Sequence, residues 1–325
     1  MQATSYQTHS SSESRAMSFA SIVFGIVAIS ALGALVLGAD VAAVKVRDSL
    51  VLCVRSVIPS IFPLAVIANM LSLGSGGEVL GRLLGKPLKL IFGVSENAAL
   101  AVVLGFICGF PIGAVAASKL YARGLISKGE FCRLMTFINN PSATFVINAV
   151  GASMLGSRNI GIAIYICVLL SACLTGIISR FFIKDTLPSL NTSHAHAPSF
   201  SSIAVSSVSS AATAMLNVCA YAVFFSAFVG VLSSTLSAVS LPEKYVALFF
   251  GIFELVGGVG EIARVGGNAA PFATAAICSW SGLSVMMQIA SVCNGKVSLT
   301  PMVISKLLQA LLSPLLLFIC IGMFI

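Results

Sequence analysis

The chain has 325 residues, of which 58% are hydrophobic and 9% are charged, and its formal net charge is +8. Soluble globular domains carry about 25% charged residues, so this composition excludes a soluble globular protein and predicts an all-α polytopic membrane protein. The basic residues stand in short clusters between apolar runs, which indicates loops that face anionic lipid rather than a nucleic-acid surface.

The first apolar run follows a polar tail. Residues 1–16 are polar, a composition typical of disorder. Residues 17–40 predict a retained transmembrane helix. The alternative is a cleaved signal peptide, because Leu37-Gly38-Ala39 resembles a cleavage site. The apolar part is about 20 residues long, however, and a signal core has only 7–15.

The rest of the chain contains apolar segments long enough to cross about 30 Å of hydrocarbon at 1.5 Å per residue. They are 56–74, 97–118, 134–155, 159–183, 207–238, 245–262, 271–293 and 300–325. Residues 184–206 are polar and predict a linker between a first repeat, 41–183, and a second repeat, 207–325. We therefore expect a multi-pass protein of the bacterial cell membrane.

The two repeats present the same order of features. In each, a plain apolar helix precedes a glycine-rich one, and a segment interrupted by small polar residues follows. Duplicated halves with interrupted segments at matching places are typical of transporters. We expect two related, inverted halves, each with a broken helix and a re-entrant hairpin. The expected helix-breaking residues are Gly109, Pro111, Gly113, Gly257 and Gly258.

The polar break of the first half is FINNPSATFV, residues 137–146. Asn before Pro is a common helix start, so a helix is expected to begin at Asn140-Pro141, near the membrane centre. This break favours a re-entrant hairpin over 134–155, which makes the halves inverted, whereas a full crossing would make them parallel. The first N–H groups of that helix, together with the asparagine amides, suit a carboxylate or another polar group.

Ser279-Trp280-Ser281-Gly282 interrupts the corresponding segment of the second half, with Ser284 and Gln288 on the following turns. Trp280, the one tryptophan of the chain, either stacks on a planar ligand or packs against the protein. We expect the two breaks to meet near the bilayer midplane and to hold a solute. The expected substrate-binding residues are Asn139, Asn140, Ser142, Thr144, Ser279, Trp280, Ser281 and Gln288.

Three ionisable residues stand out inside apolar segments. Glu254 is flanked by apolar residues, and Glu261, seven residues later, shares its helical face. Intramembrane acids usually face a cavity or a partner, so both are candidates for coupling a proton or a sodium ion. The alternative for Glu261 is an interfacial pair with Arg264. Lys119 is expected to extend its ammonium group to the membrane interface rather than to bind the solute.

Other cofactors and enzymatic sites are not expected. The nine cysteines are odd in number, form no CxxC and lie mostly in apolar runs, which is typical of small buried hydrophobes. His194 and His196 lie in a polar stretch and do not make a metal site. The chain has no HExxH and no GxSxG, so we expect that it is not an enzyme.

The stretch GFPIGAVAASKLYARGLISKGEFCRLMTFINNPSATFVINAVG resembles the bacterial sporulation integral membrane protein YlbJ family. Its features are a Gly-Phe-Pro-x-Gly motif, a basic turn and a paired-asparagine break, and the later GLSVMMQIAS is similar to a further family segment. The resemblance covers roughly residues 50–320. It implies the nucleoside-recognition or Gate architecture, which is similar to nucleoside transporters, and passage of a small polar solute. Export of dipicolinate across a forespore membrane is the activity linked with the family.

Together these observations predict a membrane transporter that binds a small solute at a midplane site and works by alternating access. The solute is expected to be a planar anion, such as a dipicolinate-like carboxylate, or a nucleoside-like molecule. The alternative is a sporulation-related structural or assembly factor without transport. The expected partners are the lipid bilayer and the solute, with no nucleic acid, and self-association into a homo-oligomer is left open.

Overall fold

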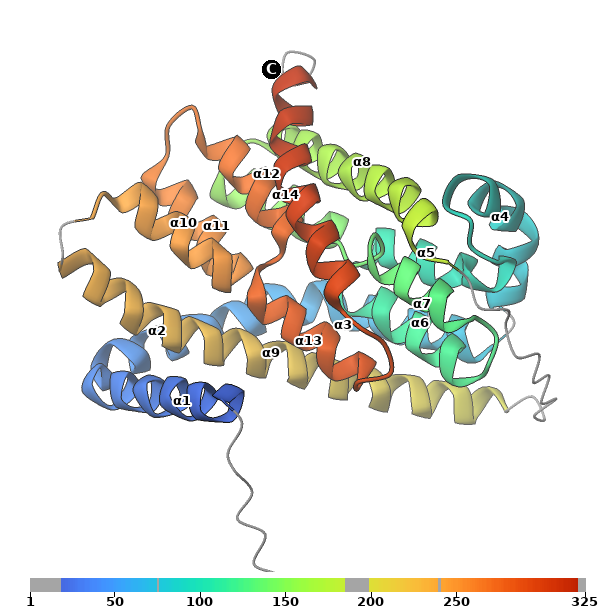
Figure 1. Ribbon diagram of the computed structural model, residues 1–325, viewed down its shortest axis with the longest axis horizontal. Helices are drawn as coiled ribbons and strands as arrows, with labels where there is room; N and C mark the ends of the chain where they lie inside the picture. The colour runs from blue at the N-terminus through green and yellow to red at the C-terminus, as the bar shows by residue number, and fades with distance from the viewer. Residues whose placement is uncertain (1–18, 75, 185–198, 239–240, 321–325) are drawn as a thin grey trace, which may run out of the picture.

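The computed structural model describes residues 19–74, 76–184, 199–238 and 241–320. The predicted tail, residues 1–16, and most of the predicted linker lie outside these ranges. The described residues form helices and no strands, as expected (Figure 1). Several large apolar side chains face outward, among them Leu37, which is 92% exposed, and Phe318, which is 73% exposed.

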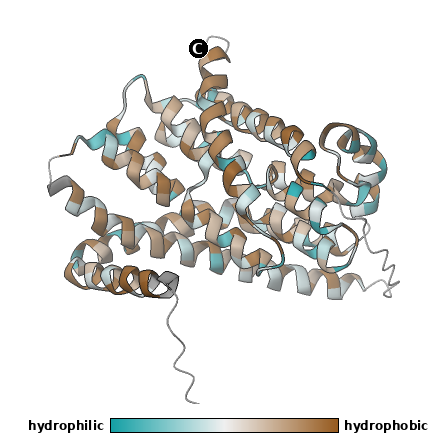
Figure 2. Ribbon diagram, in the orientation of Figure 1, coloured by the Kyte–Doolittle hydropathy of each residue, from teal (hydrophilic) through white to brown (hydrophobic). Residues whose placement is uncertain are grey.

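Four helical segments of the described residues are long and apolar enough to span a membrane, or six if two sharply bent pairs are each counted as one span. Hydrophobic residues, coloured brown, run along most of the helices in Figure 2. Exposed apolar surface on this scale requires a lipid environment. The chain is therefore a multi-pass integral membrane protein, as its composition predicted.

The first helical elements lead up to the hairpin of the first half. They are α1 (Phe19–Leu37), α2 (Ala39–Leu52), the π-helical turn η1 (Cys53–Val57), α3 (Ile58–Leu73) and α4 (Gly76–Phe92), and α3 is the plain helix of that half. The helix predicted at 17–40 is present as α1, which meets α2 at an angle of 91°. The sequence reasoning missed α2, which carries Lys45, Arg47 and Asp48 and therefore did not stand out as apolar.

A helical hairpin opens the core of the first half. It consists of α5 (Ala99–Ile107) and α6 (Ile112–Ala122), joined by a tip at residues 108–111. The two arms touch through glycines, because a Cβ on Gly113 would lie 2.7 Å from the Cα of Gly105. Such close approach of two backbones is possible only without side chains at the contact. Gly109 and Pro111 lie at the tip, as predicted for helix-breaking residues, whereas Gly113 lies in the first turn of α6 and does not break it.

The prediction of a hairpin over 134–155 is wrong. Helix α7 (Lys128–Met135) and the π-helix η3 (Phe145–Met154) flank a non-helical stretch and lie along α8 (Arg158–Phe182). The ring of Phe137 packs on Gly176, near the end of α8, whereas Gly151 packs on Gly161, near its start. These two contacts are about four turns apart on α8, so the segment runs the length of its neighbour as one broken helix.

The second half repeats this arrangement. Its helices are α9 (Phe200–Ala238), α10 (Glu243–Phe253), α11 (Leu255–Val265), α12 (Ala270–Trp280), α13 (Gly282–Cys293) and α14 (Thr300–Cys320). Helices α10 and α11 form a hairpin that packs through Gly251 and Gly258. Helices α12 and α13 together form a single span. This span is broken at Ser281, which adopts a left-handed conformation with φ 71°.

Both halves thus contain, in the same order, a plain helix, a hairpin, a broken helix and a straight helix. They also exchange matching contacts: η3 of the first half packs against α11, and α13 of the second half packs against α6. The predicted pair of related halves, each with a hairpin and a broken helix, is confirmed. The assignment of segments was exchanged: in each half the glycine-rich segment forms the hairpin, and the segment with the polar break forms the broken helix.

Candidate solute-binding site

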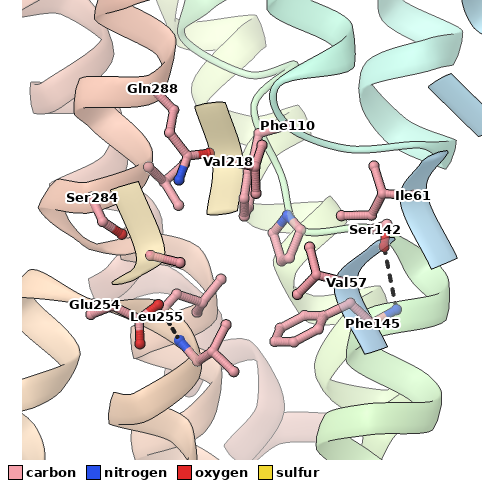
Figure 3. Close-up of a pocket in the computed structure, with 14 residues that line it drawn as sticks. Val57, Ile61, Phe110, Ser142, Phe145, Val218, Glu254, Leu255, Ser284 and Gln288 are labelled. Atoms are coloured by element: carbon pink, nitrogen blue, oxygen red, sulfur yellow. Dashed lines mark hydrogen bonds between the residues drawn. The ribbon is translucent and has the colours of Figure 1, made fainter. Parts of the chain in front are cut away.

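A small cavity lies where the hairpin tips and the broken helices converge. We call it the central cavity, and its volume is about 50 Å³. Figure 3 shows Glu254, Ser284 and Gln288 on one side of it and Val57, Ile61, Ser142 and Phe145 on the other. The full lining is Val57, Ile61, Phe110, Pro141, Ser142, Phe145, Val218, Ala222, Glu254, Leu255, Val256, Ser284, Val285 and Gln288.

The first broken helix supplies Pro141 and Ser142. Residues 136–142 are not helical, and regular helix resumes at Ala143, two residues after the predicted start. Ser142 acts as the cap, because its Oγ accepts a hydrogen bond from the N–H of Phe145 at 3.3 Å. The backbone N–H of Phe110 donates to the carbonyl of Asn140 at 2.8 Å, which joins the first hairpin tip to this break.

Asn139 and Asn140 stabilise the break from inside rather than line the cavity. Both are fully buried. The Nδ2 of Asn139 donates to the carbonyl of Met135 at 3.0 Å, and that of Asn140 donates to the carbonyl of Phe137 at 2.7 Å. The amides thereby satisfy carbonyls that the end of α7 leaves unpaired. Thr144, a third predicted ligand, is exposed and lies away from the cavity lining.

The second broken helix contributes Ser284 and Gln288, both buried. Among the described residues, the Oε1 of Gln288 has no hydrogen-bond partner, which leaves an acceptor for a solute. Trp280 takes the packing alternative, because its Nε1 donates to the carbonyl of Ile252 at 2.9 Å and it does not line the cavity. Ser279 and Ser281 are buried but do not line the cavity, and the Oγ of Ser281 donates to the carbonyl of Cys278 at 3.2 Å.

Glu254 forms the tip of the second hairpin. It is buried, and its two carboxylate oxygens accept hydrogen bonds from the backbone N–H groups of Val256, at 3.0 Å, and Gly257, at 2.5 Å. The carboxylate therefore caps α11, at the helix end that favours negative charge. The sequence predicted the helix break at Gly257 and Gly258, but the structure places it at Glu254, and both glycines lie in the first turns of α11.

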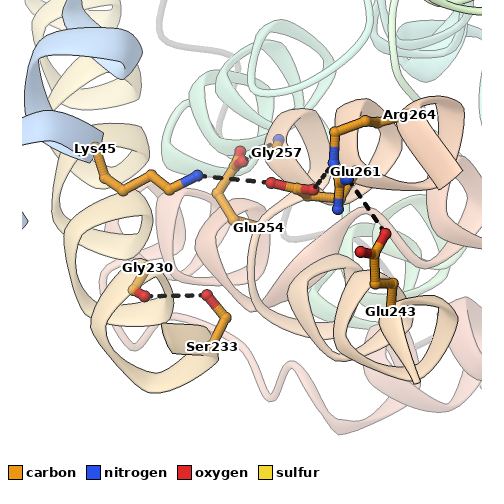
Figure 4. A network of polar contacts seen from close by, with 8 residues as sticks. All are labelled: Lys45, Gly230, Ser233, Glu243, Glu254, Gly257, Glu261 and Arg264. Atoms are coloured by element: carbon orange, nitrogen blue, oxygen red, sulfur yellow. Dashed lines mark hydrogen bonds and ion pairs between the residues drawn. The ribbon is translucent and has the colours of Figure 1, made fainter. Parts of the chain in front are cut away.

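A second cavity, of about 120 Å³, lies between α2 and the second hairpin, and we call it the α2 cavity. It shares Glu254 and three apolar residues with the central cavity. Lys45 and Glu261 line its outer part, with their charged atoms 3.5 Å apart. Figure 4 shows Glu261 between Lys45 and Arg264, whose Nε donates to it at 2.9 Å. Glu261 thus lies in an ion-pair network, as the alternative interpretation held.

With this geometry in place, the comparison with known proteins can be given. The chain is 24% identical over 290 residues to the sporulation integral membrane protein YlbJ of Bacillus subtilis (strain 168), which covers 78% of this chain and 71% of that protein. The chain is similar to YlbJ over most of its length. This finding confirms the resemblance that the sequence motifs indicated. No family model matches the chain, and no solved structure matches it.

The sequence reasoning missed the contacts of two lysines, Lys119 and Lys306, and the similarity to YlbJ does not single them out. Lys119, taken for an interfacial side chain, donates from Nζ to the Oδ1 of Asn69 at 2.7 Å and ties α6 to α3. Lys306 is fully buried in α14 and bonds to Gln309. A lysine inside the last apolar run was the available signal, because ionisable residues inside spanning segments are rare and usually functional.

Proposed function

We propose that the chain is a transporter that binds a small polar solute in the central cavity and moves it across the membrane by alternating access. One observation carries the proposal: matching elements of the two halves line this one cavity. Phe110 and Glu254 come from the two hairpin tips, Ser142 and Ser284 from the two broken helices, and Ile61 and Val218 from the two plain helices. Sites at the interface of structural repeats are the arrangement found in secondary transporters.

We further propose that the halves are inverted. In each half, the plain helix, the broken helix and the straight helix would cross the membrane once, whereas a hairpin enters and returns. Three crossings place the second half in the opposite orientation. The matching contacts of η3 with α11 and of α13 with α6 support a two-fold relation. Two inverted repeats around one site can exchange their conformations, which is the usual structural basis of alternating access.

The cavity lining suits a planar solute with hydrogen-bonding groups. Ser142 and Ser284 offer hydroxyls, and Gln288 offers an amide that can both donate and accept. Phe110 and Phe145 offer the aromatic faces that the sequence reasoning assigned to Trp280. A nucleoside-like molecule or a planar carboxylate would use both kinds of contact. Either is much larger than about 50 Å³, so the cavity must widen to admit it.

Glu254 is the proposed coupling residue. Its carboxylate accepts hydrogen bonds from two backbone N–H groups at the start of α11, and it lines both the central cavity and the α2 cavity. A proton or a sodium ion that reached it through the α2 cavity would weaken these two hydrogen bonds. Loss of a cap costs about 0.5–2 kcal/mol, enough to shift a conformational equilibrium of the hairpin several-fold. Binding of the ion and movement of the hairpin would then be linked.

The cellular setting and the alternative rest on the relative. YlbJ is named for sporulation, and we propose a role for this chain in the same process. That name gives no solute, so a structural or assembly role without transport is the second candidate. The two make different predictions about the central cavity, because a structural factor has no need to open it.

Uptake by purified protein in proteoliposomes tests the proposal. Radiolabelled dicarboxylates, including dipicolinate, and nucleosides would be screened with and without gradients of protons and sodium ions. We expect saturable uptake of one class, reduced in Gln288→Ala and unchanged in Thr144→Ala, which alters an exposed residue beside the first break that does not line the cavity. If no solute enters, or if Gln288→Ala transports as the parent does, the central cavity is not a transport site.

A further inference from the structure

Helix α14 carries a fully buried lysine. Lys306 is 1% exposed, although α14 is one of the long apolar spans. Its Nζ donates to the Oε1 of Gln309 at 3.0 Å. An ammonium has three N–H donors, and no acidic side chain among the described residues pairs with this one. A buried charge without a counter-ion is costly, so Lys306 needs a partner when it is protonated.

A polar chain connects Lys306 to a large cavity between α8 and α14. The Nε2 of Gln309 contacts the carbonyl of Thr136 and the Oγ1 of Thr175, both at 2.8 Å, and the Oγ of Ser305 at 3.1 Å. Thr136, Thr175 and Ser305 also line the cavity, which has a volume of about 550 Å³. Further hydroxyls on its wall are those of Ser179, Ser298 and Thr300. Gln309 thus stands between this α8–α14 cavity and Lys306.

A buried hydroxyl of the neighbouring helix α12 also lacks a partner. Cys278 of α12 interacts electrostatically with Lys306, and the Oγ of the next residue, Ser279, is fully buried without a hydrogen bond among the described residues. Buried polar groups are normally paired, and an unpaired hydroxyl can donate to a small anion.

We infer that Lys306 binds a small monovalent anion, of halide or formate size, at a site reached from the α8–α14 cavity. The site is separate from the central cavity and goes beyond the proposed function. The anion would accept the remaining N–H donors of the ammonium and the hydroxyl of Ser279. It would also supply the missing negative charge. Because only the protonated lysine attracts an anion, the anion and a proton bind together.

The surroundings of Lys306 make this linkage specific. Helices α7, α8 and α12 pack against α14. Of the titratable side chains that these helices carry, the Cys278 thiol is the one that interacts electrostatically with Lys306 in the described structure. No acid of the described residues therefore competes with an external anion.

The test is thermal unfolding of the purified protein in detergent, with sodium formate as the probe and sodium gluconate, a bulky anion, at the same ionic strength as the reference. We expect formate to raise the Tm by about 2 °C or more at pH 6 and by much less at pH 9. Lys306→Arg should keep this stabilisation, and Lys306→Met should lose it. Lys296→Met is the matched control, because Lys296 bonds to Ser118, does not line the α8–α14 cavity and should leave the effect intact.

Equal stabilisation of the parent and Lys306→Met by formate would overturn the inference, as would a parent Tm that formate does not change at either pH. If Lys306→Met does not fold, Ser279→Ala replaces it and should reduce the formate effect, and an undiminished effect in that variant would equally contradict the site. None of these readouts requires solute uptake, so the anion site and the proposed transport function fail or succeed independently.

Discussion

The backbone N–H of Phe110 donates a hydrogen bond of 2.8 Å to the backbone carbonyl of Asn140. This bond joins the tip of the first hairpin to the break of the first broken helix, two segments that are separated along the chain by helices α6 and α7 and the loop between them. Both partners are backbone groups in irregular structure, where a helix cannot satisfy them. The hairpin tip and the break therefore complete each other, and each is expected to depend on the other for stability.

Gly109 permits this contact, so Gly109→Ala should be strongly destabilising. Its φ is +75°, and a Cβ would lie 2.7 Å from the backbone nitrogen of Ser142. The left-handed conformation costs an alanine about 1–2 kcal/mol, and the steric overlap adds to it. We expect a lower Tm and less well-folded protein by size-exclusion chromatography in detergent.

Gly156→Ala provides the matched control for that substitution. Gly156 also has a positive φ, +69°, but nothing lies within 4 Å of its Cβ position. It should lose only the conformational contribution. If both variants have the same Tm, the packing of the hairpin tip on the break contributes no stability.

Glu254→Gln should lower solute uptake and remove its dependence on the driving ion, while expression stays intact. The amide keeps one acceptor for the N–H groups of Val256 and Gly257 but carries no charge and exchanges no proton. Uptake with and without a proton gradient measures the effect. Glu261→Gln, in the ion-pair network next to Lys45, is the control and should keep the dependence. Full uptake by Glu254→Gln with an unchanged response to pH would exclude a coupling role.

Gln288→Ala should weaken solute binding about ten-fold or more if Gln288 contacts an ionised group of the solute. A hydrogen bond to a charged group contributes about 1.5–3 kcal/mol and a neutral one about 0.5–1.5, and 1.4 kcal/mol corresponds to ten-fold. Asn140→Ala should instead lower the Tm, because it leaves the carbonyl of Phe137 unpaired away from the cavity. Solute-dependent quenching or calorimetry separates the two. A loss of solute binding in Asn140→Ala at an unchanged Tm would show that Asn140 contacts the solute.

Cysteines placed at residues 128 and 159 should be labelled from opposite sides of the membrane. Lys128 begins α7 and Asn159 lies at the start of α8, and both are exposed. The broken helix between them runs along the length of α8, so we expect it to cross the membrane fully. Labelling of Lys128→Cys and Asn159→Cys, in a background without other cysteines, by a reagent that does not cross the membrane gives the answer. Access to both from the same side would restore the hairpin over 134–155.

The sequence was sufficient to predict the break of the first broken helix. Pro141 has no N–H to donate and the preceding asparagines favour irregular backbone, and these are local properties. The position of the hairpin, in contrast, depends on packing between separate segments. A hairpin and a broken crossing both read as an apolar run with an interruption, and the difference depends on which arms pack together. Here Gly105 packs on Gly113, whereas the two arms of the α7–η3 segment lie end to end along α8.

The site residues were predicted less well for a related reason. Helical periodicity says which residues share a face, but residues 136–142 are not helical, so the directions of Asn139 and Asn140 could not be inferred. Trp280 was drawn toward the solute by its position between two serines, although the carbonyl of Ile252 satisfies its N–H. Glu254 stood out correctly as a buried acid, and only the structure shows that it caps its own helix.

Helix α9 has 39 residues, which gives a rod of about 58 Å at 1.5 Å per residue, nearly twice the thickness of the hydrocarbon core. Transmembrane helices tilt by about 20° on average, and that tilt shortens the rod very little. One end of α9 must therefore project from the bilayer or bend into the headgroup layer. Along its length it contacts α1, α2, α3, α10 and α13 (Figure 1). Helix α9 thus contacts elements of both halves. A displacement of its projecting end would therefore move the second hairpin, through α10, and the second broken helix, through α13, together.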